Sequence, residues 1–113
     1  MEEVFPEVIS LMASNLRSGM TIDKAMLLSS RPEFAPLDDE ILKTGKDIAT
    51  SKNIERALID LSKRIGSEKI HKTILLVISG IKAGGDLAIL LEETSVSMRE
   101  REFIQKKAYS GRF

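Results

Sequence analysis

The sequence has no cysteine and no tryptophan, and only four phenylalanines and one tyrosine occur among its 113 residues. Without cysteine the chain forms no disulfide and cannot build a zinc site of the finger or ribbon type. The few aromatic residues leave no platform on which nucleic-acid bases could stack. The 17 basic and 17 acidic residues give a net charge of zero, whereas nucleic-acid-binding domains normally have a basic excess. These absences argue against binding of nucleic acid.

Long hydrophobic runs are also lacking. The longest strongly apolar stretch, Ile74 to Ile78, is far too short to cross a bilayer. The first residues, MEEVFPEVI, lack the basic region that begins a signal peptide. With 42% hydrophobic residues the chain can still bury a core, so we expect residues 1–113 to form one water-soluble domain.

What the sequence does contain is helical periodicity. Apolar residues recur every three or four positions in six segments, which predicts an all-α fold, a compact bundle of about six helices. The expected helices begin near residues 6, 21, 37, 53, 67 and 86. Good capping residues precede four of them, and glycines separate most of them. The predicted N-caps are Thr21, Asn53, Ser67 and Asp86, and the predicted turn glycines are Gly19, Gly66, Gly84 and Gly85.

Three helices lead to further expectations. In the fifth, Leu75 and Leu76 widen the apolar face almost all round, which predicts a central helix. Its ILLVI run would also suit a buried strand, but the cap and the long 3.6-residue period favour helix. In the third, Gly45 indicates either a close approach by a neighbouring helix or a weak point. The sixth, residues 86–109, would span roughly 36 Å, so its C-terminal part should project beyond the bundle. Residues 31–36 form the main predicted loop.

An internal repeat is visible in three stretches, GMTIDKAMLLSS, SKNIERALIDLS and GGDLAILLEETS. Each has a tight turn, a capping residue, an apolar residue and then an apolar pair. A recurrence of this length is typical of repeated helical units. We therefore expect three related helical hairpins, in which helices one and two, three and four, and five and six pair.

Residues that could support chemistry are sparse. The only histidine, His71, has no orienting partner or nucleophile nearby in the sequence, and we interpret it as a surface residue. Lys82 precedes Gly84 and Gly85, whereas a phosphate-binding loop places its lysine after the glycines. The acidic pairs and triplets suit helix starts and solvated faces better than a calcium loop. We expect no catalytic, cofactor-binding or metal-binding residues and no enzymatic activity.

The C-terminal segment, residues 96–113, differs in charge from the rest of the chain. It has five basic and two acidic residues, a net charge of +3, with large apolar residues interspersed. Such a helix suits a membrane surface or the approach to a membrane span, but an ordinary solvated helix would look the same. The residues that would face a partner or a membrane are Arg99, Arg101, Lys106 and Lys107.

Three segments together suggest a family. The segments LRSGMTIDKAML, NIERALIDLSKR and IKAGGDLAILLEETSVSMRER resemble the cytoplasmic domain of the type II secretion system F protein family, in its archaeal type. That family includes the platform proteins of type II secretion, type IV pili and archaella. The resemblance covers residues 5–109. One departure is Ser51-Lys52, where members of the family often have glycine.

The resemblance implies a six-helix, non-enzymatic domain on the cytoplasmic side of the inner membrane, within an integral membrane protein. Its partners would be an assembly ATPase and pilin or pseudopilin, with a second copy of the chain as a further possibility. Residues 96–113 would be the juxtamembrane stalk, followed by transmembrane segments after Phe113. The alternative is a free-standing helical adaptor that binds another protein.

Overall fold

The structure is a computed structural model that describes residues 2–50 and 52–110, with the side chains of residues 102 and 105–110 left out of the description. Most of its described residues are helical and none lies in a β-strand, so the all-α prediction is confirmed. The ILLVI run is helical too. The helices are α1 (Phe5–Arg17), α2 (Ile22–Ser29), the short 3₁₀ helix η1 (Pro32–Phe34), α3 (Leu37–Ala49), α4 (Ile54–Ile65), α5 (Glu68–Lys82) and α6 (Leu87–Ser110).

Side-chain caps close the first turns of three helices. Asn53 accepts a hydrogen bond from the Arg56 N–H (3.2 Å) at the start of α4. Ser67 accepts one from the Ile70 N–H (3.2 Å) at the start of α5. Each bond satisfies an N–H that has no partner inside its own helix. In α6 the same bond runs from the Ile89 N–H to Asp86 Oδ1 (3.1 Å).

The prediction that the Thr21 side chain caps its helix is wrong. Thr21 stands at the N-cap position of α2 with extended backbone, but it makes no capping hydrogen bond. Its hydroxyl instead hydrogen bonds to the Asp23 carboxyl group, which lowers the pKa of Asp23. Such a charge-assisted hydrogen bond to a carboxylate is stronger than a neutral one.

The four turn glycines act in two ways. Gly19, Gly66 and Gly84 have φ angles of 97°, 73° and 91°, a left-handed region that suits glycine because it has no Cβ. Gly85 has no such angle. Its N–H donates to the Gly80 carbonyl at 2.9 Å, and a Cβ on Gly85 would lie 2.9 Å from that same oxygen.

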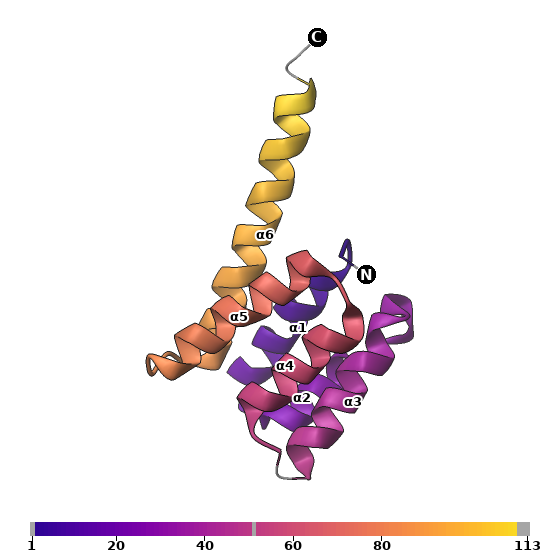
Figure 1. Cartoon of the computed structure of the whole chain (residues 1–113), viewed down its shortest axis with the longest axis vertical. Coiled ribbons are helices and arrows are strands. Elements are labelled where there is room, and N and C mark those ends of the chain that lie inside the picture. Colours follow the sequence, from indigo (N-terminus) through magenta and orange to yellow (C-terminus); the bar gives the residue numbers. More distant parts are fainter. Residues whose placement is uncertain (1, 51, 111–113) are drawn as a thin grey trace.

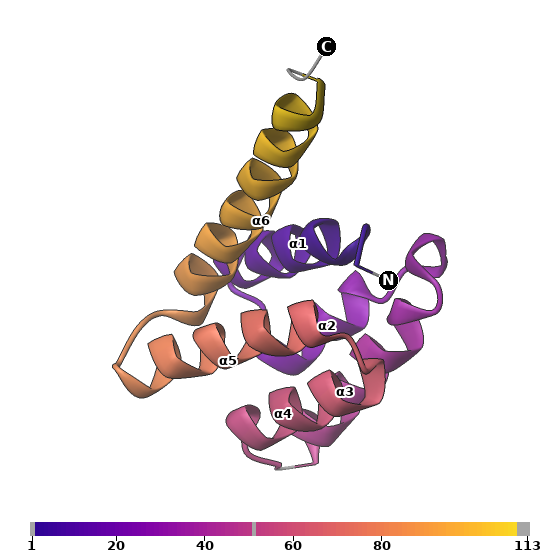
Figure 2. The same cartoon turned by 45° about the horizontal axis from the view of Figure 1, so that its top comes forward.

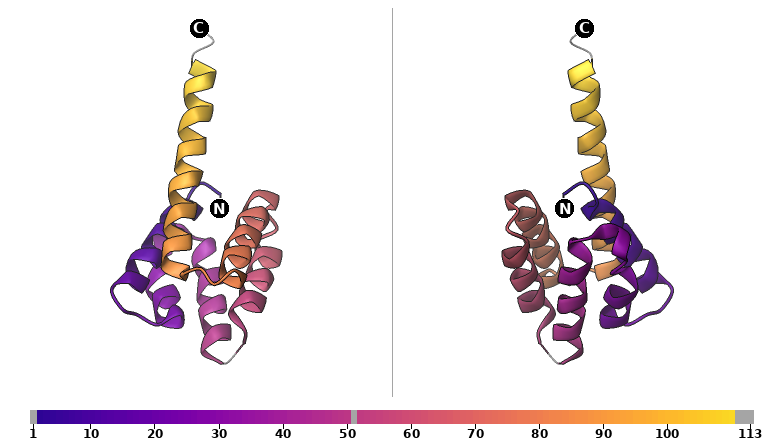
Figure 3. Two further views of the ribbon diagram at one scale, coloured as in Figure 1. Left: turned by 90° about the vertical axis from the view of Figure 1, so that its left-hand side faces the viewer. Right: turned by 90° about the vertical axis from the view of Figure 1, so that its right-hand side faces the viewer.

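The helices pack in chain order, each against the next, and α6 returns to pack along α1 (Figures 1 and 3). All three predicted hairpins are therefore present as packed pairs. The most extensive contacts, however, are between α1 and α6 and between α2 and α3, which belong to different hairpins. The bundle is thus held together mainly between the repeated units and by the return of the last helix to the first.

The hydrophobic core draws residues from every helix. α1 contributes more than any other element, with Phe5, Val8, Ile9, Met12 and Ala13 all buried. The remaining buried hydrophobic residues include Met26, Phe34, Leu37, Ile41, Leu58, Leu61, Ile70, Ile74, Val77, Ile78, Leu91 and Met98. α1 lies between α2 and α6, and this position explains why its broad apolar face is covered.

The prediction that the fifth helix is central is wrong. α5 buries the stripe of Ile70, Ile74 and Val77, but Leu75 is 44% exposed and Leu76 is 67% exposed. α4 and α6 are the elements that pack extensively against α5, and they leave the side with these two leucines uncovered. Figure 2 shows α5 on the outside of the bundle. Apolar residues around most of a helix do not by themselves decide how many sides are covered.

The predicted loop at residues 31–36 is more ordered than expected. It contains η1, whose last residue, Phe34, is only 4% exposed and belongs to the core. The segment therefore places an aromatic anchor beneath the start of α3.

Gly45 marks a close approach of α2 to α3, the first of the two interpretations above. A Cβ at Gly45 would lie 3.2 Å from Met26 Cβ and 3.3 Å from the Asp23 carbonyl oxygen. Neither atom belongs to the end of a flexible side chain. Glycine therefore permits the tight contact between the two helices.

Candidate functional surface

The feature that most clearly distinguishes this fold is the projection of α6. The helix has 24 residues, and its first half packs along α1 (Figures 1 and 2). Met98, 1% exposed, is the last buried side chain in the described part of α6. Beyond it the helix continues away from the bundle and gives a molecule of 53 × 31 × 26 Å. The predicted projection is confirmed.

The structure places the two described basic residues of this helix on different sides. Arg99 lines a shallow hollow on the outer face of α6, together with Val96, Glu100, Phe103 and Ile104. Arg101 faces the groove between α5 and α6, where its Nε donates to the Ser97 carbonyl at 3.4 Å. Two positions along a helix correspond to a turn of about 200°, so the two guanidinium groups cannot share one face.

Lys106 and Lys107 are helical, but their side chains lie outside the described residues. That the four basic residues face a partner or a membrane therefore stays a prediction.

Large apolar side chains also lie exposed on α6, in a pattern that the sequence analysis did not single out. Ile89, Val96 and Phe103 are 52%, 49% and 65% exposed. They are spaced seven residues apart and lie opposite the buried Leu91 and Met98. The signal was present in the sequence, because a seven-residue apolar spacing is typical of a helix-pairing seam.

A second hollow lies between α2 and α3, with a volume of about 400 Å³. It is open to solvent and lies over Gly45, where the two helices approach closely. Its lining is formed by Thr21, Asp23, Lys24, Leu27, Leu42, Gly45, Lys46 and Ala49. The lining combines apolar walls with two lysines and one aspartate.

His71 has a structural contact that its sequence context did not reveal. The residue is half-buried, and its Nδ1 lies 2.9 Å from Ser62 Oγ on α4. The Ser62 hydroxyl also lies 2.7 Å from the Ile59 carbonyl, to which it donates. The pair joins α4 to α5. His71 is therefore a half-buried contact residue and not simply a surface residue.

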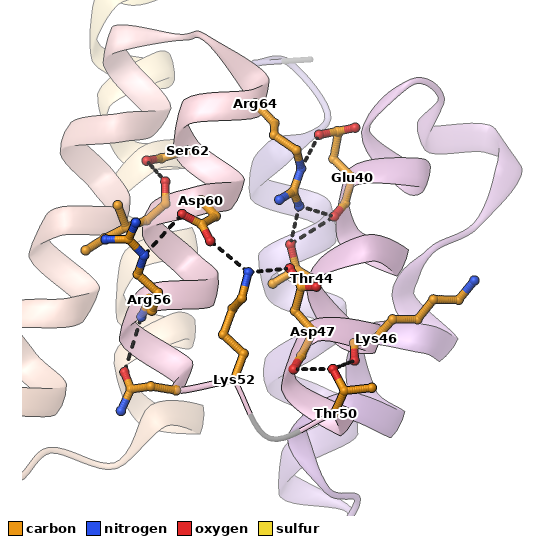
Figure 4. A network of polar contacts seen from close by, with 12 residues as sticks. Glu40, Thr44, Lys46, Asp47, Thr50, Lys52, Arg56, Asp60, Ser62 and Arg64 are labelled. Atoms are coloured by element: carbon orange, nitrogen blue, oxygen red, sulfur yellow. Dashed lines mark hydrogen bonds and ion pairs between the residues drawn. The ribbon is translucent and has the colours of Figure 1, made fainter.

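Several acidic residues pair with basic ones across helix contacts. Glu40 accepts from Arg64, whose guanidinium also donates to the Thr44 hydroxyl (2.9 Å), and this joins α3 to α4 (Figure 4). Glu92 pairs with Arg17 on α1. Among the described residues, no three histidine, aspartate or glutamate side chains gather into a group that could hold a metal ion.

A second polar contact joins the loop before α4 to both neighbouring helices. Lys52 Nζ lies 2.9 Å from Asp60 Oδ2 and 3.4 Å from Asp47 Oδ2 (Figure 4). The hydrogen bond to Asp60 is the main reason why the pKa of Lys52 is raised and that of Asp60 is lowered. These shifts arise from a surface ion pair and mark no reactive group.

Within the described residues, no helix is both long enough and apolar enough to cross a bilayer.

Comparison with known proteins gives the family. The family described as type II secretion system (T2SS), protein F, matches residues 8–113, which is nearly the whole chain. No curated protein and no solved structure gives a significant match. Proteins of this family are inner-membrane platform components of secretion and pilus systems, with cytoplasmic domains that are not enzymes. The archaeal type stays a prediction. The chain therefore belongs to the type II secretion system protein F family.

Proposed function

We propose that this domain couples an assembly ATPase to the addition of pilin or pseudopilin subunits, as the cytoplasmic part of an inner-membrane platform protein. The observation that supports this proposal best is the projecting α6. One half of the helix is fixed to the bundle through Leu91, Ser95 and Met98, and the other half extends from it. A domain of this shape is suited to pass a displacement of the bundle along the helix.

The contacts between α1 and α6 support this proposal. Ser95, 2% exposed, donates to the Pro6 carbonyl of α1 at 3.0 Å, and Arg17 pairs with Glu92 at the other end of the contact. A buried hydrogen bond and close apolar packing resist sliding of one helix along the other. Movement imposed on the bundle would therefore move α6 with it.

In this proposal the basic residues Arg99, Arg101, Lys106 and Lys107 contact lipid headgroups or an acidic surface of the machine. We expect replacement of all four by glutamate to impair filament assembly or secretion strongly. The thermal unfolding of the domain should change little, because the exposed charges of Arg99 and Arg101 contribute only about 0–1 kcal/mol each to folding and all four residues lie beyond Met98, the last buried side chain described. Normal assembly by this variant, at normal cellular levels, would contradict a role for these residues.

The ATPase part of the proposal needs a separate test. The purified domain should bind the purified assembly ATPase of the same machine, and its affinity should differ between the ATP-bound and ADP-bound enzyme. Such a difference is required because a ligand shifts a conformational equilibrium only through differential affinity. Equal affinity in both nucleotide states, or no binding in either, would contradict coupling through this domain.

A further inference from the structure

We propose that the hollow between α2 and α3 binds a short amphipathic helix of another protein, with leucine-like side chains on one face and acidic residues beside them. We call this surface the α2–α3 groove. It is defined by Lys24 and Leu27 on α2 and by Leu42, Gly45, Lys46 and Ala49 on α3. None of these residues belongs to α6, so the groove is separate from the basic residues assigned above to lipid headgroups or the machine.

The shape of the groove suits a helix. Its α3 residues are spaced three, one and three positions apart, so they lie on one face of α3 and cover about 10 Å of its length. Gly45 has no side chain, so nothing rises from the middle of this face. Leu27, which is 53% exposed, stands on the opposite wall. A hollow of about 400 Å³ between two helices can therefore take apolar side chains that a third helix presents at helical spacing.

The openness of the groove favours a protein segment over a small molecule. A small-molecule site buries most of the surface of its ligand. The α2–α3 groove is instead open to solvent along its length, and Leu27 and Ala49 on its walls are exposed. Exposed apolar side chains gathered at one hollow are typical of a protein interaction site, whereas singly scattered ones need no explanation.

The charges that border the groove favour an acidic occupant. Lys24 and Lys46 both line it, and neither forms an ion pair with any side chain that the structure describes. The one acidic residue of the lining, Asp23, already accepts a hydrogen bond from the Thr21 hydroxyl. Two ammonium groups thus remain available for the carboxylates of a partner, and such charge-assisted bonds are strong.

The other acidic residues of α3 leave these two lysines available. Asp47 follows Lys46 directly, but its carboxylate pairs with Lys52. Asp39 lies seven residues before Lys46, about 10 Å away along the helix. Positive charge is therefore concentrated where α2 begins and α3 ends. The acidic residues of the occupant should lie at this end of the groove.

The position of the groove argues against a membrane surface as its occupant. The end of α3 and the C-terminal part of α6 lie at opposite ends of the molecule (Figures 1 and 3). In the proposed function α6 leads towards the membrane, so the groove faces away from it. This step, which selects a protein rather than a lipid surface, rests on that proposed function.

Peptide binding tests the groove directly. The probe is a synthetic helical peptide of about 12 residues, roughly three turns, with leucines on one face and glutamates beside them. A second peptide has lysine in place of each glutamate. Fluorescence anisotropy should show that the acidic peptide binds at least about tenfold more tightly, because two ion pairs replace two like-charge contacts. Absence of binding, or equal affinity for both peptides, would overturn the proposal.

NMR spectroscopy locates the bound peptide. The amide signals of Leu27, Leu42 and Gly45 should shift most when the acidic peptide is added. The exposed leucines of α5, Leu75 and Leu76, provide an internal comparison, because they are apolar but lie on another helix. Shifts centred on these two leucines would place the peptide elsewhere and would overturn the groove as its site.

Charge-reversal variants test the two lysines. K24E/K46E should weaken binding of the acidic peptide by at least about tenfold and should strengthen binding of the basic one. K69E/K82E makes the same change in charge at two exposed positions on α5 and should leave both affinities nearly unchanged. Circular dichroism verifies that both variants fold. Equal weakening by the two variants would show that only net charge matters and would contradict the site.

A matched pair of leucine variants tests the apolar wall. Leu27→Ser should weaken binding of the acidic peptide by about tenfold, because the occupant loses apolar contact in the groove. Leu76→Ser changes an equally exposed leucine on α5 and should have little effect. A loss as large for Leu76→Ser as for Leu27→Ser would overturn the assignment.

Two other occupants are distinguished by the same charge variant. Vesicles of phosphatidylglycerol and phosphatidylcholine should bind K24E/K46E and the wild-type chain equally, and sedimentation equilibrium should show the same state of association for both. Loss of vesicle binding in K24E/K46E would identify a lipid surface, and loss of self-association would identify a second copy. Either result would overturn the proposal. No ATPase takes part in these measurements, so their failure would leave the ATPase test of the proposed function unaffected.

Discussion

At the scale of single residues, the most informative contact is that of Arg64. Its guanidinium group donates to Glu40 Oε2 at 2.8 Å, to the Glu40 carbonyl at 3.2 Å and to the Thr44 hydroxyl at 2.9 Å. The Arg64 side chain is 26% exposed and that of Glu40 is 19% exposed, so solvent screens this pair less than the surface pairs. Arg64 therefore fixes α4 against the first turns of α3.

We expect Arg64→Ala to reduce the free energy of unfolding by about 1–3 kcal/mol, because it leaves the partly buried Glu40 carboxylate without its donor. Arg56→Ala is the matched control on the same helix. The Arg56 side chain is 63% exposed and meets Asp60 at 3.5 Å, so its removal should cost less than about 0.5 kcal/mol. Urea unfolding followed by circular dichroism compares the two, and equal losses would contradict the importance of Arg64.

The ion pair of Lys52 and Asp60 leads to a prediction about pH. Because the pKa of Asp60 is lower in the folded chain, the pair stabilises the fold above the pKa of an unfolded aspartate, near about 4. This stabilisation is lost as the pH falls through the lowered pKa. We expect Lys52→Met to raise the pKa of Asp60 and to make unfolding less sensitive to acid below about pH 4.

Carbon-13 NMR titration of the Asp60 carboxyl group measures this shift. Lys43→Met replaces another exposed lysine of the same region, for which no ion pair is described, and it should leave the Asp60 titration nearly unchanged. An Asp60 pKa that responds equally to both substitutions would contradict the local hydrogen bond as its cause.

At the scale of elements, α5 shows that the neighbouring helices decide which side of a helix is buried. Its sequence is apolar on most sides, yet only the stripe through Ile70, Ile74 and Val77 is covered. The helix therefore packs as a peripheral element. The repeated units illustrate the same point, since the strongest packing occurs between them.

We expect Leu76→Ala to change the free energy of unfolding by less than about 0.5 kcal/mol, because Leu76 is 67% exposed. Ile74→Ala on the same helix should cost about 2–5 kcal/mol, because Ile74 is 4% exposed in the core. Chemical denaturation of both variants measures these two changes in the free energy of unfolding. Similar losses would indicate that α5 is covered on both sides, as the sequence first suggested.

At the scale of the whole molecule, the bundle and the projecting part of α6 should be separable. Met98 is the last buried side chain described, so a chain that ends at residue 101 keeps the core complete. We expect this truncated chain to unfold at nearly the same urea concentration as the full one. A chain that ends at residue 96 loses Met98 and should be less stable by about 2–5 kcal/mol. A large loss of stability in the chain that ends at residue 101 would contradict a projecting helix end.

The sequence alone determined most of the local structure. Helical period, caps and glycines predicted six helices, and the segments that resemble the family predicted the correct family. These features are local, because a period of 3.6 residues and a capping residue such as Asn53 are complete within one or two turns of chain. The projection of α6 was also predictable, because the apolar stripe weakens after Met98 while no glycine or proline ends the helix.

Only the tertiary structure decided which side of each helix is covered. Leu76 and Ile74 are equally apolar, and Phe34 lies in a segment that has the composition of a loop. Whether such residues are buried depends on distant elements and on the paths of the turns between them, which no local pattern records. The same holds for the functional surface. Arg99 and Arg101 belong to one basic segment of sequence, but the rotation of α6 against α1 and α5 places them on different faces.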